Sequence, residues 1–288
     1  MKRIKIAIGV LALLCGICAV YFVLAHEKTL VVHPKGLIAR SELDVIATHY
    51  LLMLIVVVPT LIALFIVAWK YQAKKTRDDY DPEKTSGAWE EAILWILPVL
   101  VIAPMTFMTW KSTHRLDPYR PLTNGQSDVS PLQIQVVALD WKWLFIYPEQ
   151  GIATINFVQF PDRTPIHFKL SADGSPMNSF WIPQLSGQIY AMTGMETPLY
   201  LMADGPGIYS GRAAEINGEG FADMTFVVRS SSLADFDAWV AEVKRSPLQL
   251  TEKVYNELVQ PSKKLPQAFY SAFDSGLFNR IVMKPMHP

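Results

Sequence analysis

The sequence predicts an α+β membrane protein, in which a transmembrane helical hairpin precedes an antiparallel β-sandwich and a C-terminal helical extension. Three observations support this fold class. Long uncharged apolar runs occupy the N-terminal part, short alternating segments follow Pro131, and helical periodicity returns after Ser230. The predicted segments are a signal peptide or signal anchor (1–27), the hairpin (28–116), the sandwich (117–230) and the extension (231–288).

The first apolar run covers residues 6–25 and follows three basic residues, which is the charge arrangement of a secretory signal or a signal anchor. Ala25 would suit cleavage before His26, although the run is longer than the apolar core of an ordinary signal peptide. Cys15 and Cys18 each follow a bulky residue, which disfavours lipoprotein processing. Cleavage, retention and lipid modification of this segment all stay open.

Two further apolar runs cover residues 50–69 and 92–110, and a hydrocarbon core needs about 20 apolar residues of helix. The first of them carries no charge. The second contains Pro98 and Pro104, and prolines are tolerated in membrane helices when neighbouring helices satisfy the freed backbone groups. Buried helices of a soluble protein are the alternative, but charge-free runs of this length are difficult to cover with protein. We therefore expect both runs to span a membrane.

The segment between these two runs sets the expected orientation, because basic residues favour cytoplasmic loops. Its basic residues are Lys70, Lys74, Lys75, Arg77 and Lys84. The hairpin would then begin and end outside the cytoplasm. We expect a multi-pass protein of the bacterial inner membrane whose C-terminal domain, after about Lys111, lies in the periplasm.

The charge balance argues against a nucleic-acid-binding protein, and the cysteine positions argue against disulfides and thiolate metal sites in the exported part. Lysine plus arginine and aspartate plus glutamate both number 26, and no further basic run exists, so nucleic acid is not an expected partner. Both cysteines lie in the first apolar run. The exported part therefore has neither a disulfide nor a thiolate ligand.

The predicted sandwich shows the alternation of half-buried strands, as in residues 165–171 (PIHFKLS), where Ile166, Phe168 and Leu170 share one face. Similar segments recur between Pro, Gly, Asn and Asp turn signals over about 100 residues, which is typical of an antiparallel β-sandwich. After Ser232, a suitable N-cap, apolar residues return at helical spacing. A second helix over 250–259 and a packed or trailing tail from Pro261 complete the extension.

Residues 211–224 (GRAAEINGEGFADM) have the form of a metal-binding loop without strong ligands. This loop, residues 138–151 (ALDWKWLFIYPEQG) and residues 177–195 (MNSFWIPQLSGQIYAMTGM) resemble subunit II of the haem-copper oxidases. The similarity is to the quinol oxidase branch, the cytochrome bo-type ubiquinol oxidases. The resemblance implies a cupredoxin-like sandwich. A simple hairpin turn at Asn217-Gly218 is the alternative for the loop, and it is compatible with such a scaffold.

Copper-bearing members of that superfamily hold a copper pair with thiolates, imidazoles and weak thioether and carbonyl ligands. The resemblance places Asn178 at the upstream His, Ala213 and Asn217 at the two Cys, and Phe221 at the loop His, while Glu215 and Met224 keep the family residue. Alanine and phenylalanine cannot replace these ligands, and an amide oxygen is too hard for a copper pair. We therefore expect no metal and no cofactor in this chain.

The resemblance implies a non-redox subunit of a proton-pumping ubiquinol oxidase, which passes electrons from ubiquinol to oxygen in the aerobic respiratory chain. The expected partners are subunit I, which would carry the haems and one copper, the smaller subunits, ubiquinol and membrane lipid. Two alternatives stay open. One is a membrane-anchored cupredoxin-like binding module, and the other, disfavoured by the missing ligands, is a copper-bearing cytochrome c oxidase subunit.

Glu91 is the one candidate catalytic residue, at the cytoplasmic start of the second spanning run and seven residues before Pro98. A carboxylate in a first helical turn is favoured by the helix dipole, so capping explains it from the residues alone. The resemblance implies the entrance of a proton path into subunit I for Glu91, and not for Glu90.

Trp141 and Trp143 are two apart in a predicted strand, so we expect them to share a face and to pack against a neighbouring subunit or the membrane interface. The resemblance gives Trp141 an electron-entrance role in copper-bearing members, which has no purpose here. His49 and His167 match no ligand position. We expect both histidines to be solvated or hydrogen-bonded.

Overall fold

The computed structural model describes residues 30–70, 87–122, 130–175 and 177–284, together with Gly16, Cys18, Tyr21, Phe22 and Ala25. Most of the predicted signal or anchor segment and of the basic connecting segment lies outside these residues. The chain forms two compact units. One contains the described residues up to Ser41 and those from Pro118 onward, and the other contains Glu42–Asp117.

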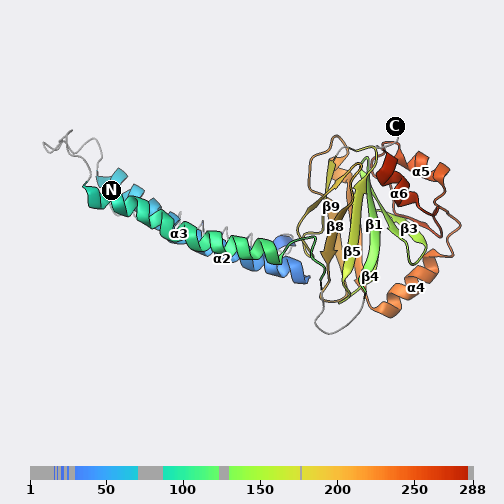
Figure 1. Cartoon of the computed structure of the whole chain (residues 1–288), viewed down its shortest axis with the longest axis horizontal. Coiled ribbons are helices and arrows are strands. Elements are labelled where there is room, and N and C mark those ends of the chain that lie inside the picture. The colour runs from blue at the N-terminus through green and yellow to red at the C-terminus, as the bar shows by residue number, and fades with distance from the viewer. Residues whose placement is uncertain are drawn as a thin grey trace. The chain divides into compact units, whose positions relative to one another are not determined.

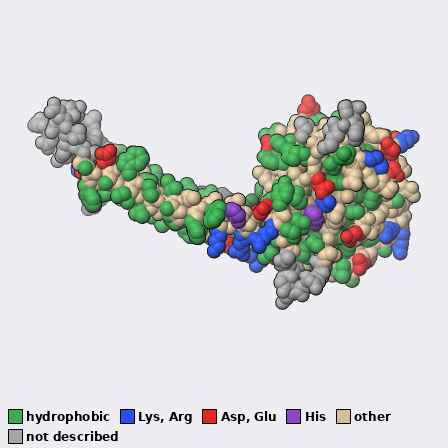
Figure 2. Space-filling model, viewed as in Figure 1, with side chains coloured by type: hydrophobic (Ala, Val, Ile, Leu, Met, Phe, Trp, Pro, Cys, Tyr) green, Lys and Arg blue, Asp and Glu red, His purple; other side chains and the backbone are tan. Residues whose placement is uncertain are grey.

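The hairpin unit is built from two long helices, α2 (Leu37–Lys70) and α3 (Ala88–Arg115) (Figure 1). Their most apolar windows have mean hydropathies of 3.1 and 2.1 and no buried residues, and both helices are long and apolar enough to cross a membrane. Hydrophobic side chains cover the visible face of this unit (Figure 2). A surface of this kind requires lipid or a protein partner as its surroundings.

His49 connects the two helices by a side-chain hydrogen bond. Its Nδ1 lies 2.8 Å from the carbonyl of Val45, which can only accept, so Nδ1 carries the proton. Its Nε2 then accepts from the Thr109 hydroxyl at 2.9 Å. The expectation of a hydrogen-bonded histidine is confirmed for His49.

The second unit contains two packed sheets, a six-stranded sheet of order β11-β3-β2-β1-β5-β8 and a five-stranded sheet of order β4-β10-β9-β6-β7 (Figure 1). The first sheet contains β1 (Leu132–Leu139), β2 (Lys142–Tyr147), β3 (Ile152–Ile155), β5 (Ile166–Ala172), β8 (Thr197–Leu201) and β11 (Ala268–Tyr270). The second contains β4 (Phe157–Pro161), β6 (Met177–Trp181), β7 (Ile189–Met192), β9 (Gly207–Ala213) and β10 (Thr225–Ser231). The same unit contains two short 3-10 turns, η1 (Leu30–Val32) and η2 (Phe221–Asp223).

The sandwich predicted from the sequence is present, but its sheets are mixed rather than wholly antiparallel. Strand β1 pairs with β5 in parallel, from Leu132↔Ile166 to Ala138↔Ala172, and β4 pairs in parallel with β10. Alternation of apolar residues fixes which face of a strand is buried and carries no information on the direction of its neighbour. The direction follows from the crossover connections between the sheets.

Aromatic side chains fill the core between the two sheets. The rings of Trp143 and Phe180 lie 5.2 Å apart, and those of Phe180 and Phe226 lie 5.0 Å apart. Helix α4 (Leu233–Val243) closes this core, and its buried side chains are Phe236, Trp239, Val240 and Val243. The Ser232 hydroxyl accepts from the Asp235 backbone N–H, which confirms the predicted N-cap.

The remainder of the extension forms a second core on the outer face of the six-stranded sheet. It contains α5 (Glu252–Val259), β11 and α6 (Leu277–Met283), so the tail that the sequence left as packed or trailing is packed. The side chains buried in this second core are Val137, Leu139, Leu144, Ile146, Ala153, Ile155, Leu250, Tyr255, Tyr270, Leu277, Phe278 and Ile281.

Candidate functional site

The loop that connects β9 to β10 is closed at its base by the backbone. The Ala213 N–H donates to the Met224 carbonyl at 3.0 Å, next to the first ladder pair of the two strands, Arg212↔Thr225. Strand β6 pairs with the same end of β9 through Phe180↔Ala213. This pairing brings Asn178 near the loop, although 39 residues separate it from Asn217.

Three of the residues aligned with ligand positions meet in one polar cluster. Asn217 Nδ2 donates to Asn178 Oδ1 and lies 3.1 Å from Met224 Sδ. Asn178 Nδ2 in turn donates to Ser175 Oγ at 2.8 Å. Asn178 and Met224 are fully buried. The fold therefore brings together three of the residues that the resemblance to copper-bearing oxidases aligns with metal ligands.

The donor atoms of this cluster do not fit a copper pair. Ala213 is buried without a donor, Phe221 packs against the main core, and Glu215 is partly exposed. What remains is two amides and one thioether, whereas a copper pair needs thiolate and imidazole donors. Among the described residues, no group of three or more His, Cys, Asp and Glu side chains is placed to hold a metal ion.

The Asn217-Gly218 dipeptide does turn the chain, within a loop longer than a two-residue hairpin. Gly218 has a φ of +116°, which L side chains rarely adopt. The Phe221 N–H donates to the Gly218 carbonyl at 3.2 Å and starts η2. The turn and the ligand-free loop are therefore parts of one structure.

Trp141 corrects an expectation from the sequence, because it is not in a strand. The pair Leu139↔Lys142 leaves Asp140 and Trp141 as a two-residue turn, with a Trp141 φ of 62°. Trp143 is fully buried in the core of its own domain, so neither the shared face nor packing of Trp143 against a neighbouring subunit holds. Asp140, a residue type that is common in turns, was the available signal.

The indole of Trp141 covers the ligand-free loop. Its Nε1 lies 3.4 Å from the Asn217 carbonyl, and a Cβ on Gly220 would overlap the indole ring. Gly220 therefore has to be glycine for the Trp141 side chain to approach the loop backbone this closely. The sequence predicted packing of Trp141 against a neighbouring subunit or the membrane interface, and the structure shows it packed on the loop of its own chain.

Glu91 lies in the first turn of α3 and is exposed, and its backbone N–H donates to Gly87 at 3.1 Å. The N-cap Gly87 makes no side-chain capping bond. Pro98 lacks the N–H that would bond the Leu94 carbonyl, and Glu91 is three residues from Leu94, on the same helix face. The Glu91 carboxylate therefore lies one helical turn before the residue to whose carbonyl Pro98 cannot donate.

Sequence similarity to known proteins assigns the chain to a family. It is 46% identical over 255 residues to cytochrome bo(3) ubiquinol oxidase subunit 2 of Pseudomonas aeruginosa, covering 88% of this chain and 76% of that protein. It is 44% identical over 254 residues to ubiquinol oxidase subunit 2 of Acetobacter aceti, covering 88% and 82%. The chain belongs to the ubiquinol oxidase subunit 2 family.

Membership in the ubiquinol oxidase subunit 2 family confirms the resemblance expected from residues 138–151, 177–195 and 211–224. Together with two helices apolar enough to cross a membrane, it makes the chain a membrane protein. The family model described as COX Aromatic Rich Motif matches residues 244–288, which contain α5, β11 and α6.

Among solved structures, the chain is similar to the periplasmic domain of subunit II of cytochrome oxidase from Bradyrhizobium japonicum. The identity is 20%, the match covers 42% of this chain and 96% of that domain, and the TM-score is 0.38. The assignment to the ubiquinol oxidase subunit 2 family rests on the sequence relatives.

Proposed function

We propose that this chain is a metal-free subunit II of a ubiquinol oxidase, an oxidoreductase complex that passes electrons from ubiquinol to oxygen. The single observation that carries the metal-free part is the cluster of Asn178, Asn217 and Met224, where amides bond to one another at the positions of soft ligands. A chain with these donors has no electron relay of its own.

The loss of a relay agrees with a lipid-soluble reductant. A quinol delivers its electrons within the bilayer, so no metal centre outside the membrane is needed between it and the haems. We place the haems, one copper and the oxygen chemistry in subunit I. This chain then contributes the hairpin, which packs in the membrane, and the sandwich, which docks on its partner subunits.

The proposed location is the bacterial inner membrane, with the sandwich in the periplasm. The support is the group of basic residues that begins with Lys70, the last residue of α2, and continues in the segment before α3. Loops rich in basic residues stay on the cytoplasmic side of a membrane. The first residues of α3, among them Glu91, would then face the cytoplasm.

For Glu91 we propose the entrance of a proton path. A carboxylate at the cytoplasmic end of α3 can take up protons from water. We take the Leu94 carbonyl, to which Pro98 cannot donate, as the next acceptor for a water molecule along α3. Helix capping remains the competing explanation, and turnover of the Glu91 variant separates the two.

The experiment is purification of the native complex through a tag on this chain, followed by haem and metal analysis and oxygen consumption with two reductants. The proposal predicts co-purified haem, ubiquinol oxidation and no oxidation of ferrocytochrome c. Ferrocytochrome c oxidation with additional copper would favour a cytochrome c oxidase subunit. A purified chain without haem would favour the membrane-anchored binding module.

A further inference from the structure

Strands β1 and β2 require cover on both faces. In β1, Val136, Val137, Ala138 and Leu139 are all fully buried, and so is every residue of β2 from Trp143 to Tyr147. Continuous apolar runs of this kind are typical of strands that are packed on both sides. The five-stranded sheet covers one face, and the C-terminal extension covers the other.

Buried polar groups of the sandwich find their partners in this extension. Lys142 is 1% exposed, and its Nζ donates to the Gln260 carbonyl at 2.7 Å and to Ser262 Oγ at 2.5 Å. Asn156 Nδ2 donates to the Leu265 carbonyl at 2.9 Å. A buried ammonium or amide is costly unless it is hydrogen-bonded, so these contacts specify where the extension lies.

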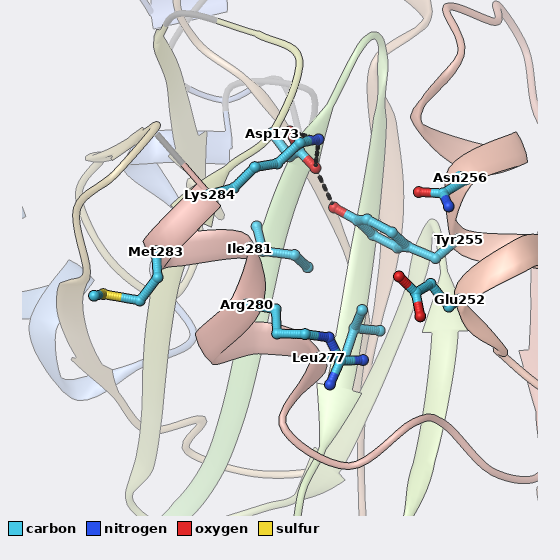
Figure 3. Close-up of a pocket in the computed structure, with 9 residues that line it drawn as sticks. All are labelled: Asp173, Glu252, Tyr255, Asn256, Leu277, Arg280, Ile281, Met283 and Lys284. Atoms are coloured by element: carbon cyan, nitrogen blue, oxygen red, sulfur yellow. Dashed lines mark hydrogen bonds and ion pairs between the residues drawn. The ribbon is translucent and has the colours of Figure 1, made fainter. Parts of the chain in front are cut away.

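Asp173 provides a third attachment, at the end of β5. Its carboxylate is almost buried and accepts from the Tyr255 hydroxyl at 2.7 Å and from Lys284 Nζ at 2.8 and 2.9 Å. Tyr255 belongs to α5, and Lys284 follows α6. Figure 3 shows both side chains converging on Asp173 across the pocket between the two helices. One carboxylate therefore holds both α5 and the end of α6.

The same extension reaches the ligand-free loop through two lysines. Lys263 Nζ lies 2.7 Å from Glu219 Oε2 and 5.5 Å from the centre of the Trp141 ring. Lys264 Nζ lies 3.9 Å from Asp223 Oδ1. Each exposed pair alone contributes little, but the two neighbouring pairs and the ring contact act on the same loop.

From these contacts we infer that the aromatic-rich extension, residues 244–284, is an intramolecular clamp. It forms the outer layer of the six-stranded sheet, and through Lys263 and Lys264 it positions the loop of residues 214–224. A bound metal cross-links a loop by joining its ligands. Here the cross-link is made from outside the loop, by the extension. This role does not depend on the oxidase function.

Hydrogen exchange of the full-length chain, measured by mass spectrometry, tests the clamp. Lys142→Met removes both donations of the ammonium at similar side-chain length. It is expected to speed amide exchange in α5 and α6 by at least about tenfold while α4, which belongs to the main core, keeps its protection. Tyr255→Phe, a milder change, should act in the same direction by roughly fivefold, as for one lost hydrogen bond.

The double variant Lys263→Gln and Lys264→Gln tests the loop. Exchange in residues 217–223 is expected to rise roughly threefold with α6 unchanged, since exposed pairs contribute little individually. Lys253→Gln, on the exposed side of α5, is the matched control and should change neither region. The inference is overturned if the double variant leaves loop exchange at the wild-type rate. Equal loss of protection in α4 and in the extension of the Lys142 and Tyr255 variants would also overturn it.

Discussion

The side-chain amide of Asn217 donates a hydrogen bond to the side-chain oxygen of Asn178, on a strand that the fold places beside the loop. The bond fills a buried position where the resemblance to copper-bearing oxidases predicts two soft ligands. Asn178 Nδ2 donates in turn to Ser175 Oγ, and Met224 Sδ lies 3.1 Å from Asn217 Nδ2. The alignment of this loop with a metal-binding loop can be tested by restoring the ligands.

Restoring four ligands should create a copper centre. The quadruple variant Asn178→His, Ala213→Cys, Asn217→Cys and Phe221→His supplies the thiolates and imidazoles that a copper pair requires. We expect a purple protein with a near-infrared absorption band after copper is added. The double variant Asn178→His and Phe221→His, which lacks both thiolates, is the control and should show no such band. A folded quadruple variant without the band would contradict the alignment.

Removal of the Glu91 carboxylate should slow proton-coupled turnover. In the assembled enzyme, Glu91→Ala is expected to reduce steady-state oxygen consumption about tenfold, equivalent to roughly 1.4 kcal/mol of barrier. Glu90→Ala changes the same helical turn and the same charge, and should leave the rate near wild type. If the two variants behave alike, the carboxylates only stabilise the start of α3.

The connection between the N-terminal segment and the sandwich should depend on Gly36. A Cβ at Gly36 would lie 2.8 Å from the Leu185 and Met202 carbonyl oxygens, and Arg40 pairs with Asp204 at 2.5 Å just beyond it. We expect Gly36→Ala to reduce the free energy of unfolding of the sandwich by about 1–3 kcal/mol, because the two backbones must separate.

Chemical denaturation followed by tryptophan fluorescence measures this effect. Gly205→Ala is the control, since a Cβ at Gly205 meets nothing within 4 Å. Equal unfolding midpoints for the two glycine variants would show that the segment around Gly36 is not fixed to the sandwich.

His167 should give the sandwich an acid-sensitive component of stability. Burial and, to a smaller extent, Lys169 lower the pKa of His167, while Glu196 opposes them, and the ring stacks on Tyr200 at 4.3 Å. Since the folded state favours the neutral ring, the unfolded state binds more protons below about pH 6.5. The free energy of unfolding should therefore fall as the pH drops from the His167 pKa of the unfolded chain towards the lower His167 pKa of the folded chain.

Denaturation at about pH 7.5 and about pH 5.5 measures this component, on either side of the ordinary histidine pKa. His167→Phe keeps a planar ring against Tyr200 and removes the titration, so its stability should change less between the two conditions. The same pH dependence in wild type and variant would assign it to other groups.

The long apolar helices and the sandwich could be predicted from the sequence, because each depends on local pattern. The missing ligands of the loop could be read from the sequence directly. It did not reveal the parallel pairing of β1 with β5, since alternation does not encode strand direction. Trp141 was misplaced for a related reason. An aromatic residue has a high strand propensity, and the two-residue turn around it is determined by the register of β1 and β2.

The packing of the tail could have been predicted from a signal within the strands themselves. Residues 136–139 and 143–147 are apolar on both faces, so a layer was needed outside the sandwich. Which segment supplies this layer depends on contacts distant in sequence, such as Lys142 with Gln260 and Asp173 with Lys284. Pattern reasoning within a short window cannot identify such pairs.

The copper content of this chain, separated from its partner subunits after purification of the native complex, tests the central claim most directly. The account predicts copper far below one ion per chain, with the haems and the copper of the complex remaining in the partner fraction. Stoichiometric copper in the separated, unmutated chain would contradict it.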